Sequence, residues 1–188
     1  MVLVPEFGWH VLNGWTFLAA YFLGLIATVA TFPGEKRKKL FYEPSPPRGS
    51  PRWLILMGGR LCAVSFVILM LFTPLQMDTV FFAVGAALYL AGYAVVVISL
   101  LDYRRAPVGQ PVLDGLYHWS RNPQWVGLVL VYAGSTMEVA SWLHLGLLLG
   151  LVVAYHFQIL TEEEACLAFY GEAYGVYMDR VPRYLRFG

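Results

Sequence analysis

Five apolar runs dominate the sequence, at residues 7–32, 53–75, 79–101, 123–137 and 139–160. A helix needs about 20 apolar residues to cross a bilayer, so four runs are long enough and the fourth in order is short. Little more than Glu138 separates the last two runs, which predicts a tight helical hairpin. The pattern therefore predicts an all-α polytopic membrane bundle with about five transmembrane helices. A four-span bundle whose last two runs form a shallow re-entrant pair is the alternative.

The composition agrees with a place in the bilayer. Hydrophobic residues make up 59% of the chain and charged residues 13%, against about 25% charged in an average soluble domain. The net charge of +1 gives no reason to expect a nucleic-acid partner. Two cysteines and four scattered histidines form neither a disulfide framework nor a metal-ligand spacing, so we expect no metal.

Positive charges gather in residues 36–60, 104–121 and 180–186. The positive-inside rule assigns these segments to the cytoplasm, which puts the amino terminus outside and the carboxy terminus inside. The first of them, residues 35–52, is basic and then proline-rich. It fits a topological signal and a stiff connector, with contact to anionic lipid as the alternative.

Two polar segments bracket the predicted hairpin. In the first, Arg121 precedes Asn122 and Pro123, which suit the N-cap and the first turn of a helix. An arginine beside free helix amides favours an anionic group. In the second, we expect the last helix to run on past residue 160 and to end at Gly171. It then carries three consecutive glutamates, 162–164, at least one of which must point inward. Physics alone predicts a cytoplasm-facing site for an anionic or zwitterionic ligand.

The spacing of these segments resembles that of the integral-membrane methyltransferases, which include the isoprenylcysteine carboxyl methyltransferases and the phospholipid N-methyltransferases. The similarity covers the carboxy-terminal 40% or so of the chain, in the patterns LxGxYxxxRxPxWxG (from Leu113) and EExxxLxFxGxxYxxYxxRVP (from Glu162). The family usually has histidine where this chain has Asn122. Asparagine there is closer to the phospholipid-methylating branch, whereas Arg121 is closer to the carboxyl-methylating branch.

The resemblance implies S-adenosylmethionine as cofactor and a lipid or other hydrophobic acceptor, carboxylate or amine, that enters from the bilayer. The amino-terminal spans resemble the family only in being spans. We expect a three-span membrane region at residues 1–101, from the apolar runs, and a catalytic region at 102–188 with a cytoplasmic loop, the hairpin and a cytoplasmic helix. Cofactor contacts carried over residue by residue fall on Gly115, Tyr117, Asn122, Pro123, Glu162 and Glu163. Catalytic or substrate-orienting roles fall on Arg121, Glu163, Tyr177 and Arg180.

Two other functions are compatible with the sequence. Sterol-type double-bond reductases, which use a reduced nicotinamide cofactor, have a similar carboxy-terminal pattern, although they are usually larger and have more spans. A non-catalytic membrane module is the third reading. The module would bind neither S-adenosylmethionine nor a nicotinamide, so cofactor binding separates the three.

Overall fold

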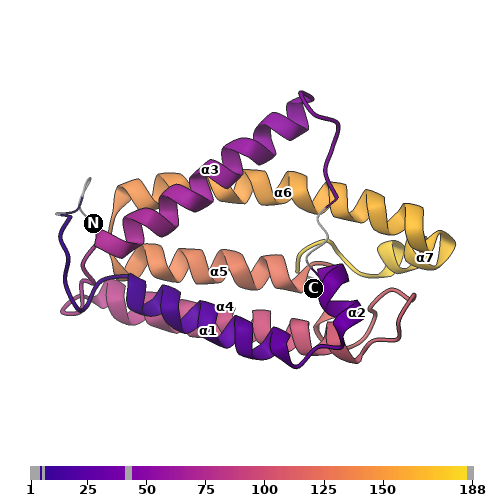
Figure 1. The fold of residues 1–188 in the computed structure, drawn as a ribbon, viewed down its shortest axis with the longest axis horizontal. Coiled ribbons are helices and arrows are strands. Elements are labelled where there is room, and N and C mark those ends of the chain that lie inside the picture. The colour runs from indigo at the N-terminus through magenta and orange to yellow at the C-terminus, as the bar shows by residue number, and fades with distance from the viewer. Residues whose placement is uncertain (1–4, 6, 41–43, 186–188) are drawn as a thin grey trace.

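The computed structural model describes residues 5, 7–40 and 44–185, and the elements of this part of the chain are all helices, joined by loops (Figure 1). Its elements, in chain order, are α1 (Trp15–Ala30), α2 (Gly34–Leu40), α3 (Pro51–Phe72), α4 (Val80–Arg105), the 3₁₀ helix η1 (Gly115–His118), α5 (Pro123–Glu138), α6 (Trp142–Tyr170) and α7 (Glu172–Arg180). The predicted all-α polytopic bundle is confirmed.

Three helices, α3, α4 and α6, are long and apolar enough to cross a membrane. Helices α1 and α5 have 16 residues each, or about 24 Å, which is short of the ~30 Å hydrocarbon layer. The first apolar run is helical only from Trp15, because the residues before it bond the connection that follows α3. Gly8 N donates to Phe72 O, and Gly14 N donates to Thr73 O, both at 3.0 Å.

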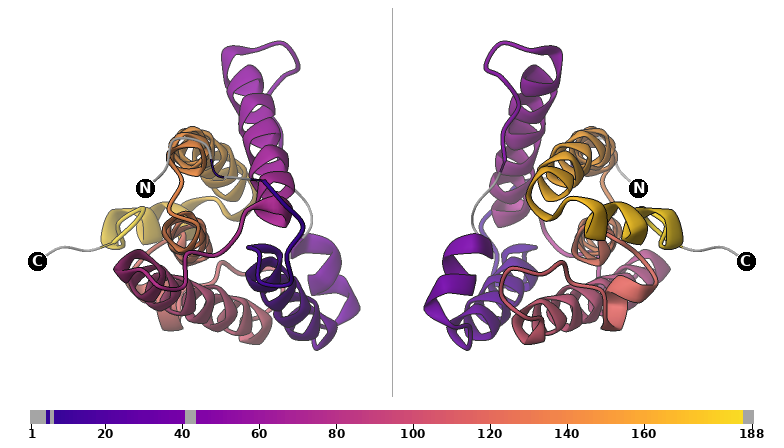
Figure 2. Two further views of the ribbon diagram at one scale, coloured as in Figure 1. Left: turned by 90° about the vertical axis from the view of Figure 1, so that its left-hand side faces the viewer. Right: turned by 90° about the vertical axis from the view of Figure 1, so that its right-hand side faces the viewer.

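The five long helices alternate in direction, so the same ends gather together (Figures 1 and 2). One end of the bundle holds the start of α3, the end of α4, η1, the start of α5, the end of α6, and helices α2 and α7. Both polar segments predicted to carry the site are therefore at this end. Helix α3 packs on α6 but diverges from it toward its own first turn (Figure 1).

Helices α4 and α5 form the closest contact in the bundle, through glycines that let the two backbones touch. A Cβ added at Gly134 would lie 2.5 Å from Gly85 O, and one added at Gly92 would lie 2.6 Å from Gly127 O. The spacing of seven residues on each helix keeps both contacts on one face. This seam fixes the start of α5 against the end of α4. Helix α4 also runs through residues 101 and 102, where the sequence suggested a boundary between two regions.

The last helix ends as predicted. Helix α6 continues to Tyr170, and Gly171, with φ of 59°, donates its N–H to Leu167 O at its end. Its 29 residues span about 43 Å, so its final turns extend beyond the hydrocarbon layer. The basic half of residues 35–52, predicted to be connector, is instead the short helix α2.

Candidate active site

The two polar segments meet at Asn122 and Glu163. The Asn122 side-chain amide donates to Glu163 Oε1 at 2.9 Å and to Arg183 O at 3.2 Å. Asn122 occupies the predicted N-cap position of α5, but its side chain makes no capping bond. The predicted position is right and the predicted bond is wrong, because the amide turns to α6 instead.

Glu163 is bound by two guanidinium groups as well. Arg121 donates to it through Nε at 3.2 Å and Nη2 at 3.3 Å, and Arg183 donates through Nε at 3.0 Å. The Glu163 side chain is 4% exposed, that of Arg121 8% and that of Arg183 32%. The hydrogen bond to Glu163 raises the pKa of Arg183. A buried carboxylate is tolerated here because charged donors compensate its desolvation.

The sequence missed the central role of Arg183, which lies beyond the matched pattern of the second segment. Hydrogen bonds to the backbone carbonyls of Pro182 and Arg183 hold this residue at the site. Arg121 N donates to Pro182 O at 3.0 Å, and Ser120 Oγ donates to Arg183 O at 3.2 Å. Arg121 Nη1 also donates to Met178 O at 2.8 Å. The chain after α7 is thus held against the start of α5, and the one available signal was the charge of residues 180–186.

Two tyrosines, buried Tyr177 and half-buried Tyr117, support the first segment. Tyr177 of α7 donates its hydroxyl to Tyr117 O at 2.7 Å, and the Tyr117 hydroxyl accepts from Gln124 Nε2 at 3.0 Å. Burial raises the pKa of both phenols above its usual value. Both therefore stay protonated near neutral pH, and they act here as hydrogen-bonding groups.

Gly115 lets the same segment turn at the end of α4. Its φ is +65°, and a Cβ there would lie 2.1 Å from Asp102 Oδ2. The same oxygen accepts from Leu116 N at 3.0 Å. Any larger residue would displace the Asp102 carboxylate, so glycine is required by both conformation and space.

The three consecutive glutamates of α6 make three different contacts, as the helical rotation demands. Glu162 accepts from Trp125 Nε1 at 2.9 Å and from Gln158 Nε2 at 3.0 Å. Glu163 points inward to the arginines, and Glu164 pairs with Arg52 of α3 at 2.7 Å. The prediction that at least one of them points inward is confirmed.

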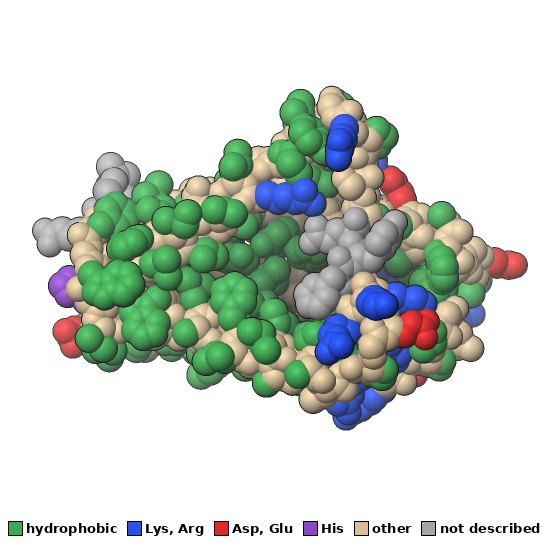
Figure 3. Space-filling view, in the orientation of Figure 1, with side chains coloured by type: hydrophobic (Ala, Val, Ile, Leu, Met, Phe, Trp, Pro, Cys, Tyr) green, Lys and Arg blue, Asp and Glu red, His purple; other side chains and the backbone are tan. Residues whose placement is uncertain are grey.

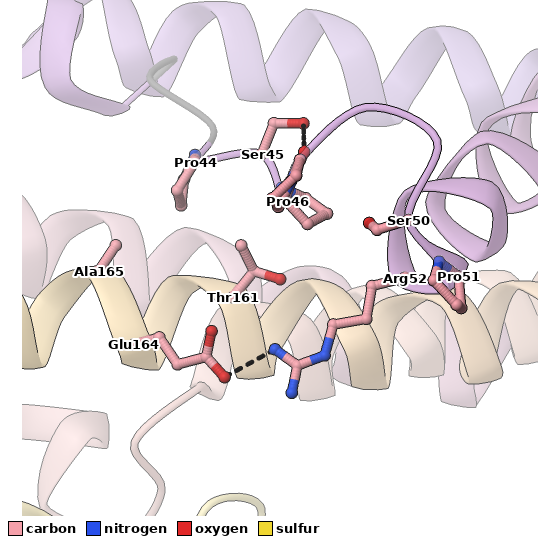
Figure 4. Close-up of a pocket in the computed structure, with 10 residues that line it drawn as sticks. Pro44, Ser45, Pro46, Ser50, Pro51, Arg52, Thr161, Glu164 and Ala165 are labelled. Atoms are coloured by element: carbon pink, nitrogen blue, oxygen red, sulfur yellow. Dashed lines mark hydrogen bonds and ion pairs between the residues drawn. The ribbon is translucent and has the colours of Figure 1, made fainter.

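Trp125 lines one of two cavities, and chain neighbours of Glu162 line the other. The larger, about 690 Å³, lies between α6 and the residues before and at the start of α3, with Arg52 reaching Glu164 across it (Figure 4). The smaller, about 180 Å³, lies between α1, α4 and α5 and has Trp125 in its wall. Glu162 directly follows Thr161, which lines the larger cavity. The hydrogen bond from Trp125 to Glu162 therefore connects the wall of the smaller cavity to the helix that lines the larger one. The face drawn in Figure 3 is hollowed between α3 and α1.

The residues predicted from the resemblance divide into three sets. Arg121 and Asn122 are bonded to Glu163, and we call these three residues, with Arg183, the Glu163 cluster. Tyr177 precedes Met178, whose carbonyl accepts from Arg121, and donates its hydroxyl to Tyr117 O. Gly115 lies in η1 with Tyr117, and Pro123 is buried at the first position of α5. Glu162 lies on another face of α6 and bonds Trp125, and Arg180 is exposed at the end of α7.

The surroundings of the two cavities differ in chemistry. Serine, threonine and proline side chains line the larger one together with the Arg52–Glu164 pair, whereas aliphatic and aromatic side chains line most of the smaller. Neither lining includes any of the six cofactor residues predicted from the resemblance, although their chain neighbours Gln124 and Thr161 are there. Within the described part of the chain, no cluster of three His, Cys, Asp or Glu side chains is placed to hold a metal ion.

A polar site of this form, at one end of an apolar bundle, suits a reaction between a polar cofactor and a hydrophobic acceptor. Comparison with curated proteins and with solved structures finds no match. The family model described as phospholipid methyltransferase matches residues 80–173, from the start of α4 into the start of α7. This match covers half of the chain and contains most of the Glu163 cluster. The chain therefore belongs to the phospholipid methyltransferase family and is a membrane methyltransferase.

Proposed function

We propose that the protein transfers a methyl group from S-adenosylmethionine to a lipid or other hydrophobic acceptor at the end of the bundle that carries the Glu163 cluster. The observation that carries this proposal is the 2.9 Å contact between Asn122 and Glu163. It joins the two segments whose spacing resembles that of the membrane methyltransferases, and residues close to each partner in the chain, Gln124 and Glu164, line two cavities of different polarity.

The larger cavity is our candidate for the cofactor. Its volume of about 690 Å³ falls within the ~300–1,000 Å³ typical of small-molecule sites. The hydroxyls of Ser50 and Thr161 and the charges of Arg52 and Glu164 offer partners for a ligand that carries hydroxyl, amino and carboxylate groups. We assign ribose hydroxyls to the half-buried carboxylate of Glu162, on the adjoining face of α6.

The other five carried-over residues take supporting roles in this proposal. Asn122 and Glu163 are bonded to each other, and Tyr117 is bonded to Gln124. We propose that they, with Gly115 and Pro123, hold the first polar segment and the start of α5 in the shape that the cofactor requires. Residues locked by such contacts present a site with little cost in reorganisation.

The smaller cavity suits the apolar part of the acceptor. Leu25, Val96, Leu100 and Leu128 contribute to its wall, and Trp125 joins it to the Glu162 side. Of the two arginines predicted to orient the acceptor, Arg121 is bonded to Glu163. We therefore assign direct contact with an anionic acceptor group to Arg180, which is exposed.

Catalysis of this reaction depends mainly on how the protein positions the cofactor and the acceptor. The sulfonium cofactor supplies an already activated methyl group, so the protein gains rate by aligning the acceptor and excluding water. A carboxylate acceptor needs no base, whereas an ammonium acceptor must first lose a proton. Tyr177 is a poor base because its pKa is raised by burial, and Glu163 is held by two arginines. These observations favour an acceptor that arrives deprotonated.

We further propose that this end of the bundle faces the cytoplasm, on the strength of its positive charges.

Titration of the purified protein with S-adenosylmethionine and, separately, with a reduced nicotinamide cofactor tests this function. We expect saturable binding of S-adenosylmethionine and none of the nicotinamide. The reverse result would support a reductase, and binding of neither would support a non-catalytic module. In each of those two cases the proposal is wrong.

A further inference from the structure

A positively charged surface lies over α2 and the end of α4 and takes no part in the proposed reaction (Figure 3). It contains six cations and two carboxylates, all between residues 35 and 105. Arg37, Lys38, Lys39 and Arg105 are exposed, whereas Lys36 is buried and Arg104 is half-buried. The carboxylates are Glu35, 3.5 Å from Lys39, and Asp102, 3.7 Å from Arg105. The surface therefore keeps a substantial excess of positive charge.

Buried Lys36 fixes this surface in place. Its ammonium donates to three carbonyls at the end of α4: Tyr103 O at 3.2 Å, Arg104 O at 2.5 Å, and Ala106 O. A cation there satisfies carbonyls that have no partner within the helix and opposes the negative end of its dipole. Arg104 Nη1 adds a bond to Thr31 Oγ1 at 2.8 Å, which ties the end of α1 to the same point. A helix of seven residues is thereby held by tertiary contacts.

The position of α2 identifies the partner. Leu40, its last residue, packs on the buried apolar cluster of Phe32, Val96 and Leu100, so α2 lies against α4, a helix long and apolar enough to cross a membrane, near the end of that helix. The exposed cations of α2 then lie where helices leave the hydrocarbon layer. The groups of opposite charge at that depth are phospholipid phosphates, and a surface cation near an anionic leaflet gains about fivefold in affinity.

We propose that the surface formed by Arg37, Lys38, Lys39 and Arg105 binds the headgroup of an anionic phospholipid. The lipid is held by charge and by hydrogen bonds to its phosphate, with its chains extending into the bilayer. Leu40 also lines the smaller cavity, so a lipid bound here lies next to that cavity. This inference does not depend on the methyl-transfer reaction.

Native mass spectrometry of the intact protein in detergent, titrated with phosphatidylglycerol or with phosphatidylcholine, tests the proposal. The double variant Arg37→Gln/Lys38→Gln removes two positive charges from the surface. Arg48→Glu is the matched control, since it changes the net charge equally at an exposed residue on the loop between α2 and α3. We expect about 25-fold weaker retention of phosphatidylglycerol in the double variant, less than a twofold change in the control, and little effect on phosphatidylcholine.

Equal weakening in both variants, or none in either, would overturn the proposal, because bulk charge or another surface would then account for binding. Displacement of the lipid by an equal concentration of inorganic phosphate would overturn the lipid as the occupant. Lys36→Met gives a second test. Its side chain is buried against α4, so any loss of lipid beyond that in Arg48→Gln reflects the displacement of α2. If Lys36→Met binds the lipid as well as Arg48→Gln does, Lys36 does not hold α2 in place against α4.

Discussion

The side-chain nitrogen of Asn122 lies 2.9 Å from Oε1 of Glu163, although 41 positions separate the two residues in the chain. This bond joins the first turn of α5 to the last turns of α6, at the end where α7 and the chain after it also dock. Arg121 and Arg183 complete the shell around the carboxylate. The Glu163 cluster is thus the point on which the geometry of the proposed site depends, and its energetics can be tested residue by residue.

Replacing Glu163 with Gln should destabilise the protein strongly. The carboxylate balances two guanidinium groups, and removing one partner of a buried ion pair typically costs about 3–5 kcal/mol. The matched control is Glu164→Gln, because Glu164 forms an exposed pair with Arg52 that contributes at most about 1 kcal/mol. Thermal unfolding of both variants in the same detergent measures the difference. Similar midpoints would show that the Glu163 cluster is not a structural centre.

The glycine seam between α4 and α5 predicts a second contrast. In Gly134→Ala the new Cβ would lie 2.5 Å from backbone atoms of both Gly85 and Tyr89, which cannot move aside independently. We expect a loss of about 1–3 kcal/mol in stability. Gly146→Ala adds the same group to α6 where nothing lies within 4 Å, and should be neutral or stabilising by up to about 1 kcal/mol. Chemical unfolding measures both, and the opposite order would refute the close approach of the two helices.

Much of this architecture could be predicted from the order of residues. The apolar runs, Pro123 as the first residue of a helix, the length of α6 and the stop at Gly171 all follow from local rules. The pairing of Asn122 with Glu163 was predicted only as a convergence of two segments. Its chemical form depends on tertiary contacts that no local rule contains.

The features that the sequence did not predict also depend on tertiary contacts. Helix α2 is too short and too charged to be stable alone, and exists because Lys36 bonds the end of α4. Asn122 does not cap α5 because a buried carboxylate nearby is a stronger acceptor for its amide. Arg183 was overlooked in favour of Arg180, since charge alone does not tell which of two nearby arginines turns inward.

Glu162→Gln should weaken S-adenosylmethionine binding about tenfold while leaving the fold intact. The substitution keeps the shape of the side chain but removes the charge and one acceptor that we assign to the ribose hydroxyls. Isothermal titration with the purified variant measures the affinity, and Glu172→Gln, at an exposed residue in the first turn of α7 outside both cavities, controls for the loss of one acidic charge. Unchanged affinity in Glu162→Gln would remove Glu162 from the cofactor site.

Tyr177→Phe distinguishes a supporting tyrosine from a catalytic base. The Tyr177 hydroxyl donates to Tyr117 O, so its removal should cost about 0.5–1.5 kcal/mol in stability. Burial raises the pKa of the hydroxyl, which makes it a poor base. Turnover at saturating substrates should stay within a few-fold of the parent. A loss of kcat by two orders of magnitude or more, with cofactor binding preserved, would instead identify Tyr177 as the base.

The most direct test of the central claim is transfer of the methyl group itself. The purified protein is incubated in bilayers of mixed phospholipids with S-adenosylmethionine that carries a deuterated methyl group, and the extracted lipids and hydrophobic products are analysed by mass spectrometry. We predict that the label appears in a lipid or hydrophobic acceptor, and that the yield at limiting cofactor falls in Glu162→Gln but not in Glu172→Gln. Absence of label from every hydrophobic product, with a folded protein in the bilayer, would contradict the account.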